Sequence, residues 1–224
     1  MEKLLFAVDI GQESGCELLK TPDGGLVTRL ECTKRLLKRF VHLKHALSKA
    51  HEFGVCTITD SASWSLHFTP EPDVAIAAID NIQFCDRLFP SCDLRSLFDL
   101  MQVSLIAMVT PCKPELPHPD SNYALRVILV YAQSNTVPQC PAPAEMAELF
   151  ARHSKLFIDT VYLHDTAADS NMVGAIFDIL GSVEGPLSRH VELSRQIQRY
   201  EIGMMELLAN PLHRAPNSQH RWIA

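Results

Sequence analysis

Short, strongly apolar runs alternate with amphipathic segments along almost the whole chain, and this alternation limits the fold more than any other feature. Four runs have the length and composition of buried strands, at residues 4–8, 53–58, 125–131 and 156–163. Runs that are apolar on both faces are typical of parallel strands covered by helices on both sides. The chain is therefore predicted to be α/β, with a doubly wound, mostly parallel sheet.

The segments between these runs carry apolar residues at three- and four-residue spacing, as amphipathic helices do. Helices are expected over residues 26–50, 70–82, 94–101, 145–152, 172–180 and 197–208, with Asp93 as the N-cap of the third. Trp64, Leu66 and Phe68 alternate soon after the second run and predict a hairpin, which adds one antiparallel edge strand. A last short strand is expected at 190–193, an exposed proline-rich loop at 110–120 and another proline-rich loop at 138–143. We assign residues 1–209 to this domain and 210–224 to a C-terminal docking tail.

Composition narrows the class of protein. The chain has 224 residues, a formal net charge of -6 and seven cysteines. An acidic chain has no general attraction for nucleic acid or for anionic membranes, and no apolar run has the length of a signal-peptide core or a transmembrane helix. The cysteines are widely spaced without a CxxC pair, which favours free thiols over disulfides or structural zinc. We therefore expect a cytoplasmic and nuclear protein that binds neither nucleic acid nor membrane.

In a doubly wound sheet, ligands bind at the loops that follow the carboxyl ends of the strands. The loop from Asp9 to Gly15 contains neither GxGxxG nor a P-loop, and the chain has no GxSxG elbow. His164 and Asp165 follow the fourth run and would offer a base beside a carboxylate, although adjacent residues rarely orient each other. Asp9, Asp60 and Asp165 would either converge on a metal ion or cap turns. A small-molecule enzyme and a metal-dependent ligand-binding domain thus stay open as alternatives.

Two further features suit protein partners. The first helix carries a basic face that is either solvated or meets an acidic partner; it consists of Lys34, Arg35, Lys38, Arg39, Lys44 and Lys49. The segment after the last helix combines prolines, which limit the entropy lost on binding, with an arginine and a tryptophan, which are common interface anchors. We assign partner-binding roles in this tail to Pro211, Leu212, Arg214, Pro216 and Trp222.

Four strings of the sequence resemble one family. They are KHALSKAHEF at 44–53, LRVILVY at 125–131, FIDTVYLH at 157–164 and LLANPLHR at 207–214. In this order, and over nearly the whole chain, they are similar to the von Willebrand factor A-like subunit shared by the BRISC and BRCA-one A deubiquitinase complexes. The resemblance implies a von Willebrand factor A-like fold and a non-catalytic scaffold subunit without a cofactor.

The resemblance also implies partners. In that family the subunit binds chiefly the subunit with ubiquitin-E2-variant (UEV) domains, and through it the JAMM-type zinc metalloprotease and its pseudoenzyme scaffold. These complexes cleave non-degradative, lysine-linked polyubiquitin, and the BRCA-one A complex acts in the DNA damage response. The resemblance therefore predicts that this chain stabilises such a complex and performs no chemistry.

Metal-binding von Willebrand factor A domains carry DxSxS after the first strand, a threonine in a later loop and an aspartate after the central strand. This chain keeps Asp9 but has Gly11 and Glu13 at the serine positions, and Ala132-Gln133-Ser134 where the aspartate motif would lie. Two hydroxyl ligands and one carboxylate are missing, so we expect the metal site to be degenerate, and absent or badly weakened.

Overall fold

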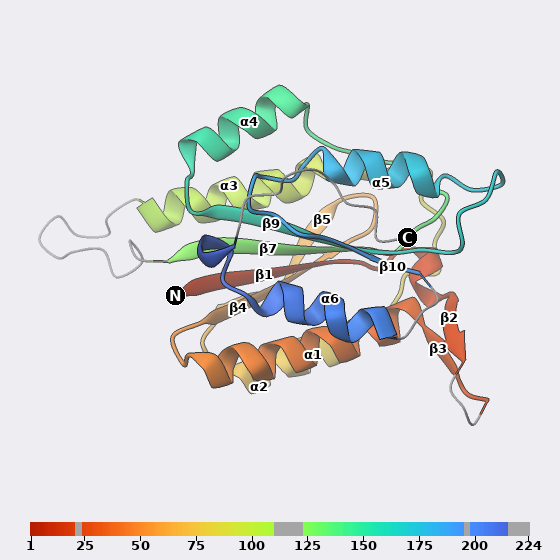
Figure 1. The fold of residues 1–224 in the computed structure, drawn as a ribbon, viewed down its shortest axis with the longest axis horizontal. Coiled ribbons are helices and arrows are strands. Elements are labelled where there is room, and N and C mark those ends of the chain that lie inside the picture. Colours follow the sequence, from red (N-terminus) through yellow and green to blue (C-terminus); the bar gives the residue numbers. More distant parts are fainter. Residues whose placement is uncertain (21–23, 110–122, 195–197, 215–224) are drawn as a thin grey trace, which may run out of the picture.

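The apolar runs form the centre of a six-stranded sheet (Figure 1). The computed structural model describes residues 1–20, 24–109, 123–194 and 198–214. The sheet order is β10-β9-β7-β1-β4-β5, with β1 (Glu2–Asp9), β4 (Glu52–Ile58), β5 (Ala62–Thr69), β7 (Ala124–Tyr131), β9 (Leu156–Leu163) and β10 (His190–Leu193). All neighbours are parallel except β4 and β5. The predicted fold class, with one antiparallel edge strand, is confirmed.

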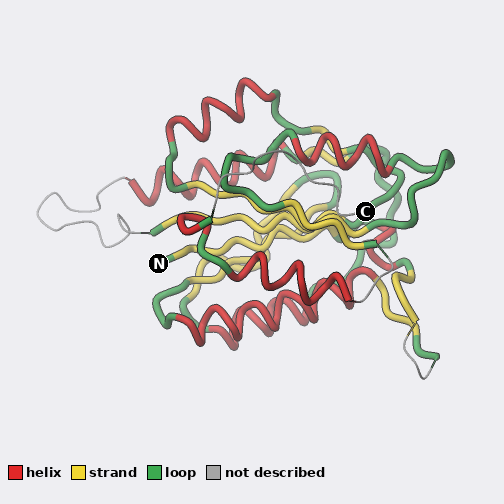
Figure 2. The backbone as a smooth tube through the Cα atoms, viewed as in Figure 1, coloured by secondary structure: helices red, strands yellow, loops and turns green. Residues whose placement is uncertain are grey.

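Helices cover both faces of the sheet (Figure 2), which explains why every residue of β7 and β9 is buried. One face packs against α1 (Arg29–Leu47), α2 (Pro72–Asn81) and α6 (Gln198–Leu208), and the other against α3 (Arg95–Val109), α4 (Pro143–Arg152) and α5 (Val173–Gly181). Side chains of a strand alternate between faces, so Leu4 and Phe6 enter the first core and Leu5 and Ala7 the second. None of the described helices is long and apolar enough to cross a bilayer.

The first helix is shorter than its apolar periodicity predicts. Residues 26–28 form β3 (Leu26–Thr28), which pairs with β2 (Glu17–Lys20) in a hairpin that the sequence analysis missed. A capping box then starts α1: the Thr28 hydroxyl accepts the N–H of Glu31, and the Glu31 carboxylate accepts the N–H of Thr28. The helix ends at Leu47 because Ser48 is extended, with φ of -158°.

Two other boundaries also shift. Asp93 lies in β6 (Cys92–Asp93), which pairs with β8 (Pro138–Gln139) inside the segment expected to be a proline-rich loop. Its carboxylate still accepts the N–H of Arg95, at 3.0 Å, at the start of α3. The loop predicted at 110–120 lies outside the described residues, as does Cys112, whereas the six described cysteines are free thiols.

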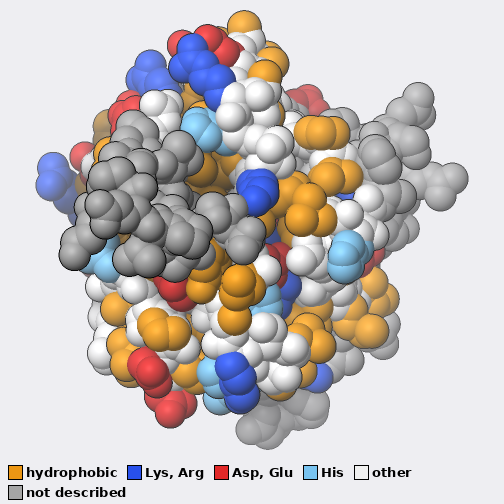
Figure 3. All heavy atoms as spheres, turned by 90° about the vertical axis from the view of Figure 1, so that its left-hand side faces the viewer, with side chains coloured by type: hydrophobic (Ala, Val, Ile, Leu, Met, Phe, Trp, Pro, Cys, Tyr) orange, Lys and Arg blue, Asp and Glu red, His pale blue; other side chains and the backbone are white. Residues whose placement is uncertain are grey.

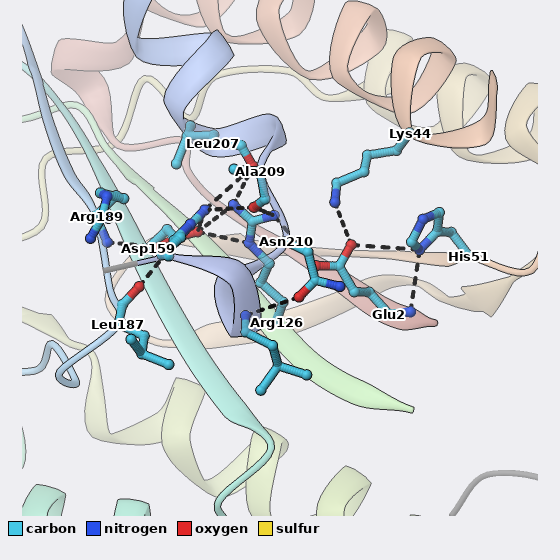
Figure 4. A network of polar contacts seen from close by, with 12 residues as sticks. Glu2, Lys44, His51, Arg126, Asp159, Leu187, Arg189, Leu207, Ala209 and Asn210 are labelled. Carbon is cyan, nitrogen blue, oxygen red and sulfur yellow. Dashed lines mark hydrogen bonds and ion pairs between the residues drawn. The ribbon is translucent and has the colours of Figure 1, made fainter. Parts of the chain in front are cut away.

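A group of charged side chains lies inside the domain, between the sheet and the end of α6 (Figure 4). Asp159 of β9 is fully buried and accepts hydrogen bonds from Arg126 Nε at 2.7 Å, Arg214 Nη1 at 2.6 Å and the backbone N–H of Arg189 at 2.8 Å. Arg126 also donates to the carbonyl of Leu207, and Arg214 to that of Ala209. Two guanidiniums therefore satisfy carbonyls at the carboxyl end of α6 and complement its dipole.

Glu2 extends this group to the first helix (Figure 4). Its carboxylate pairs with Lys44 of α1 and lies 3.6 Å from Arg126 Nη1. His51 Nδ1 accepts the backbone N–H of Glu2 at 3.2 Å, and burial lowers the pKa of His51, so the imidazole is neutral at pH 7. Lys44, which the sequence analysis placed on the basic face, is thus an internal side chain.

The segment assigned to a separate tail begins as part of the domain. Pro211 is buried in η3 (Pro211–His213), and Arg214 is 9% exposed because its guanidinium is bound to Asp159. Leu212 is exposed, and Pro216 and Trp222 lie outside the described residues. Arg214 therefore has a structural partner within the chain, and the partner-binding role of the tail stays a prediction.

Removing the Asp159 carboxylate should destabilise the domain strongly. In Asp159→Ala the guanidiniums of Arg126 and Arg214 stay buried without their carboxylate, which costs about 3–5 kcal/mol. Urea unfolding measures the loss, with Asp169→Ala, an exposed aspartate in the loop after β9, as the control. A loss as small as that of the control would show that the cluster does not hold the sheet and α6 together.

Candidate functional site at the carboxyl end of the sheet

The loops after β1 and β7 meet at Asp9, where a von Willebrand factor A domain binds its metal. Asp9 Oδ1 accepts the backbone N–H of Gly11 at 2.8 Å and Gln133 Nε2 at 3.1 Å, and Oδ2 accepts the N–H of Ala132 at 3.0 Å. The carboxylate is 1% exposed. A Cβ at Gly11 would lie 2.7 Å from Gln133 Nε2, so a side chain there would push Gln133 away from Asp9. Donors of the protein itself thus hold both carboxylate oxygens.

This environment shifts the acidity of Asp9. Burial raises the pKa of its carboxyl group to about 6, because the charged form loses its hydration. The hydrogen bonds from Gly11, Ala132 and Gln133 act in the opposite direction, and the negative charge of Glu13 adds to the rise.

Arg29 binds the loops that surround Asp9. It is the first residue of α1, and its side chain is fully buried. Nη1 donates to the carbonyl of Ala132 at 2.7 Å and to Glu13 Oε2 at 3.1 Å, while Nη2 donates to Asp165 Oδ2 at 2.7 Å. One guanidinium thereby connects the loops that follow β1, β7 and β9.

Glu13 lies in the short helix η1 (Gln12–Gly15) and contacts the loop after β7 as well. Its carboxylate accepts the backbone N–H groups of Ser134 at 2.8 Å and Asn135 at 3.1 Å, besides the guanidinium of Arg29. At this position a serine would bind the metal. The glutamate here instead binds the β1 loop to the β7 loop.

These residues do not fit a divalent cation. A metal ion needs oxygen ligands with free lone pairs, but both oxygens of Asp9 face N–H donors and the Glu13 carboxylate is held by Arg29. The guanidinium of Arg29 also brings a positive charge to the loops after β1 and β7, and this charge would repel a cation. Within the described residues, no group of three His, Cys, Asp or Glu side chains is arranged to bind a metal.

The enzyme alternative at His164 is not supported by the geometry. The ring of His164 is buried against Tyr162, with Nδ1 2.5 Å from the backbone oxygen of Asp165 and Nε2 2.8 Å from Glu192 Oε1. The Asp165 carboxylate binds Arg29 instead. Asp60 is exposed, and its carboxylate accepts the hydroxyl of Thr59. Of the alternatives that the sequence left open, the geometry thus does not support the pairing of His164 with the Asp165 carboxylate or a convergence of Asp60 on Asp9.

The sheet order, the flanking helices and the strand-end loop at Asp9 define a von Willebrand factor A-like fold. The von Willebrand factor A (VWA) domain of SpRpn10 has a TM-score of 0.57 at 12% identity and covers 91% of this chain and 93% of that one. BatB from Bacteroides thetaiotaomicron has a TM-score of 0.57 at 13% identity, covering 92% and 97%. Proximal thread matrix protein 1 from the mussel byssus has a TM-score of 0.61 at 10% identity, covering 94% and 48%. Identities this low show the fold alone.

Proteins with similar sequences narrow the comparison beyond the fold. The chain is 26% identical over 222 residues to the Homo sapiens protein named BRISC and BRCA1-A complex member 1, covering 95% of this chain and 65% of that protein. The Xenopus laevis protein of the same name is 24% identical over 217 residues, covering 95% and 64%. The chain thus spans less than two thirds of the length of these relatives, and no protein-family model matches it. The resemblance seen in the sequence strings is confirmed.

The raised pKa of Asp9 predicts a pH dependence of stability. A folded-state pKa of about 6, against an ordinary 3.8, means that protonated Asp9 favours the folded state. The stabilisation by protonated Asp9 is fully present below pH 3.8, the ordinary pKa, and is lost as the pH rises through about 6. Between about pH 4.5 and 7.5 the free energy of unfolding of the wild type should fall by about 2 kcal/mol more than that of Asp9→Asn, which cannot ionise.

Urea unfolding of the wild type and of Asp9→Asn at both pH values gives the change in unfolding free energy with pH for each protein, and the prediction concerns the difference between these two changes. Asp178→Asn, which changes an exposed aspartate of α5, is the matched control and should follow the wild type. If Asp9→Asn showed the same pH dependence as the wild type, Asp9 would not be held in the buried environment described above.

Proposed function

We propose that the chain is a non-catalytic scaffold subunit of an assembly like the BRISC and BRCA1-A complexes. The observation that carries this proposal is the closed strand end: Arg29, Gln133 and a backbone N–H group already donate to the oxygens that a metal would use as ligands. A domain whose ligand site is closed would act by binding other proteins at its surface. The match to complex members over 95% of the chain supports the same role.

Within this proposal, the chain binds the UEV-domain subunit and thereby joins a JAMM-type zinc metalloprotease and its pseudoenzyme scaffold. The substrate of the whole assembly is non-degradative, lysine-linked polyubiquitin, and the zinc chemistry takes place on the metalloprotease. The site of action is the cytoplasm and the nucleus, where the assembly would serve the DNA damage response, DNA repair and chromatin regulation. The name shared by the relatives supports membership of the complexes, and the finer partner assignment rests on the sequence resemblance.

Co-expression with the UEV-domain, pseudoenzyme and metalloprotease subunits tests the proposal. We expect this chain to co-elute with them in size-exclusion chromatography, and the complex to cleave lysine-linked diubiquitin while this chain alone does not. A complex assembled without this chain should have a lower thermal stability, since a bound subunit stabilises its partners by mass action. Failure to co-elute, or cleavage by this chain alone, would contradict the proposal.

The tail needs a truncation that leaves the domain intact. Deletion from Asn210 would remove Arg214 and with it two bonds to Asp159, so loss of binding would then be confounded by unfolding. A chain that ends after Arg214 keeps the buried cluster and lacks only residues 215–224, with Pro216 and Trp222. Weaker co-elution of this shorter chain, with unchanged thermal stability, would support the docking role of the tail.

A further inference from the structure

The buried cluster around Asp159 holds one more positive charge than it holds negative charges. Its carboxylates are those of Glu2 and Asp159, and its cations are Lys44, Arg126 and Arg214. The side chain of each is at most 3% exposed. The two carboxylates can balance two of the three cations. Four of these residues belong to strands or to α1, and Arg214 is the cation that comes from outside them, after η3.

The end of α6 compensates the additional charge of Arg214. The guanidinium donates to the carbonyl of Ala209 at 3.1 Å and lies 3.4 and 3.5 Å from the carbonyl oxygens of Glu206 and Leu207. These oxygens lie at or just after the carboxyl end of α6, where the helix dipole is negative. Arg214 and the end of α6 thus stabilise each other, and they are close neighbours in the sequence.

Arg214 also repels the cations beside it. Burial lowers the pKa of Arg126 and that of Lys44, and in both cases the positive charge of Arg214 acts in the same direction. Movement of Arg214 into water would therefore relieve its repulsion of both neighbours. It would cost the two bonds between its guanidinium and Asp159, which are 2.6 and 3.1 Å long.

The rest of the cluster would stay paired if α6 and Arg214 left together. Asp159 would keep its bond to Arg126 Nε at 2.7 Å. Lys44 would stay paired with Glu2. Breaking a buried ion pair is costly when it leaves a charge without a partner, and here two carboxylates would still face two cations. The charges that remain in the sheet and in α1 therefore allow this segment to open.

Few of the residues in 198–214 whose burial is described pack into the domain. The buried ones are Gly203, Leu207, Pro211 and Arg214, whereas Met205 is 72% exposed. Every residue of β7, by comparison, is buried. Figure 3 views the molecule from the side on which η3 and the end of α6 lie, and both hydrophobic and charged side chains reach the surface there. Segments with few buried contacts open at a lower free energy than the core of a domain.

From the balance of charges and the sparse packing we infer that residues 198–214, with α6 and η3, form a C-terminal latch that opens as one unit while the sheet stays folded. Arg214 holds the latch closed through Asp159 and the carbonyls of α6. In the open form Pro211 and Arg214, for which the sequence predicted partner-binding roles, would become accessible. A partner would then compete with Asp159 for Arg214. Opening is a property of the chain alone and does not depend on the proposed function.

Hydrogen exchange of the full chain, followed by mass spectrometry, tests the latch through the ratio of the exchange rates of α6 and β7. In the wild type the amides of α6 should exchange about tenfold faster than those of β7 or more, because opening of the latch exposes α6 alone. Arg214→Gln should raise this ratio by about a further tenfold, since it removes charged hydrogen bonds that only the closed latch makes. Arg214→Lys, which keeps the charge, should raise the ratio by less and replaces Arg214→Gln if that variant does not fold.

Arg126→Gln is the matched variant, because it removes the other guanidinium from Asp159. Arg214 would then be the last cation on that carboxylate, so opening of the latch would leave Asp159 unpaired. The ratio of the exchange rates should therefore fall toward one in Arg126→Gln. Arg152→Gln, which changes an arginine of α4 that is 68% exposed, is the control and should keep the wild-type ratio.

Three results would contradict the latch. A ratio near one in the wild type would mean that α6 opens only when the whole domain unfolds. Equally faster exchange of α6 and β7 in Arg214→Gln would mean that Arg214 stabilises the whole domain as a single unit. Unchanged exchange of α6 in Arg214→Gln would mean that Arg214 does not hold this segment closed. None of these results bears on the scaffold proposal, which co-elution with the other subunits tests separately.

Discussion

Asp159 lies in the middle of a strand that is buried on both faces, and its negative charge has to be compensated inside the protein. Arg126 on the neighbouring strand supplies one guanidinium, and Arg214 brings a second from the far end of the chain. Because both arginines also bind carbonyls at the end of α6, this one carboxylate connects the central strands to the last helix. A buried ion pair contributes little net stability over apolar packing, but removing one partner is costly because it leaves an uncompensated charge inside the protein.

The same principle operates at the opposite end of the sheet, with a different consequence. There Arg29 forms ion pairs with Glu13 and Asp165, and N–H donors bind both oxygens of Asp9. The residues that remain at the ligand position of the fold are thus bound to each other. The helices α1 and α6 lie on the face of the sheet where the Asp159 cluster connects the strands to the end of α6.

Sequence reasoning found the strands because the runs 4–8, 125–131 and 156–163 are almost continuously apolar. Short runs of this kind are typical of strands in a sheet that helices cover on both faces. It missed Arg126 and Asp159 because both lie inside such runs, although opposite charges within two neighbouring buried strands were a readable sign of a pair. It also missed the β2–β3 hairpin, for which Gly24, with φ of 83°, was the local signal. Nothing in the pattern around Arg29 showed that its side chain would point inward, since that depends on how loops from three strands meet.

The central claim is that an internal guanidinium closes the strand-end site of this von Willebrand factor A-like domain. The most direct measurement is the thermal unfolding midpoint of the wild-type chain with and without millimolar Mg²⁺ or Mn²⁺, beside the Asp9→Asn variant. A ligand that binds the folded state raises this midpoint, so the account predicts the same midpoint with and without either ion. A rise that Asp9→Asn abolishes would show that the site binds metal after all, and the closed site would no longer support the scaffold proposal.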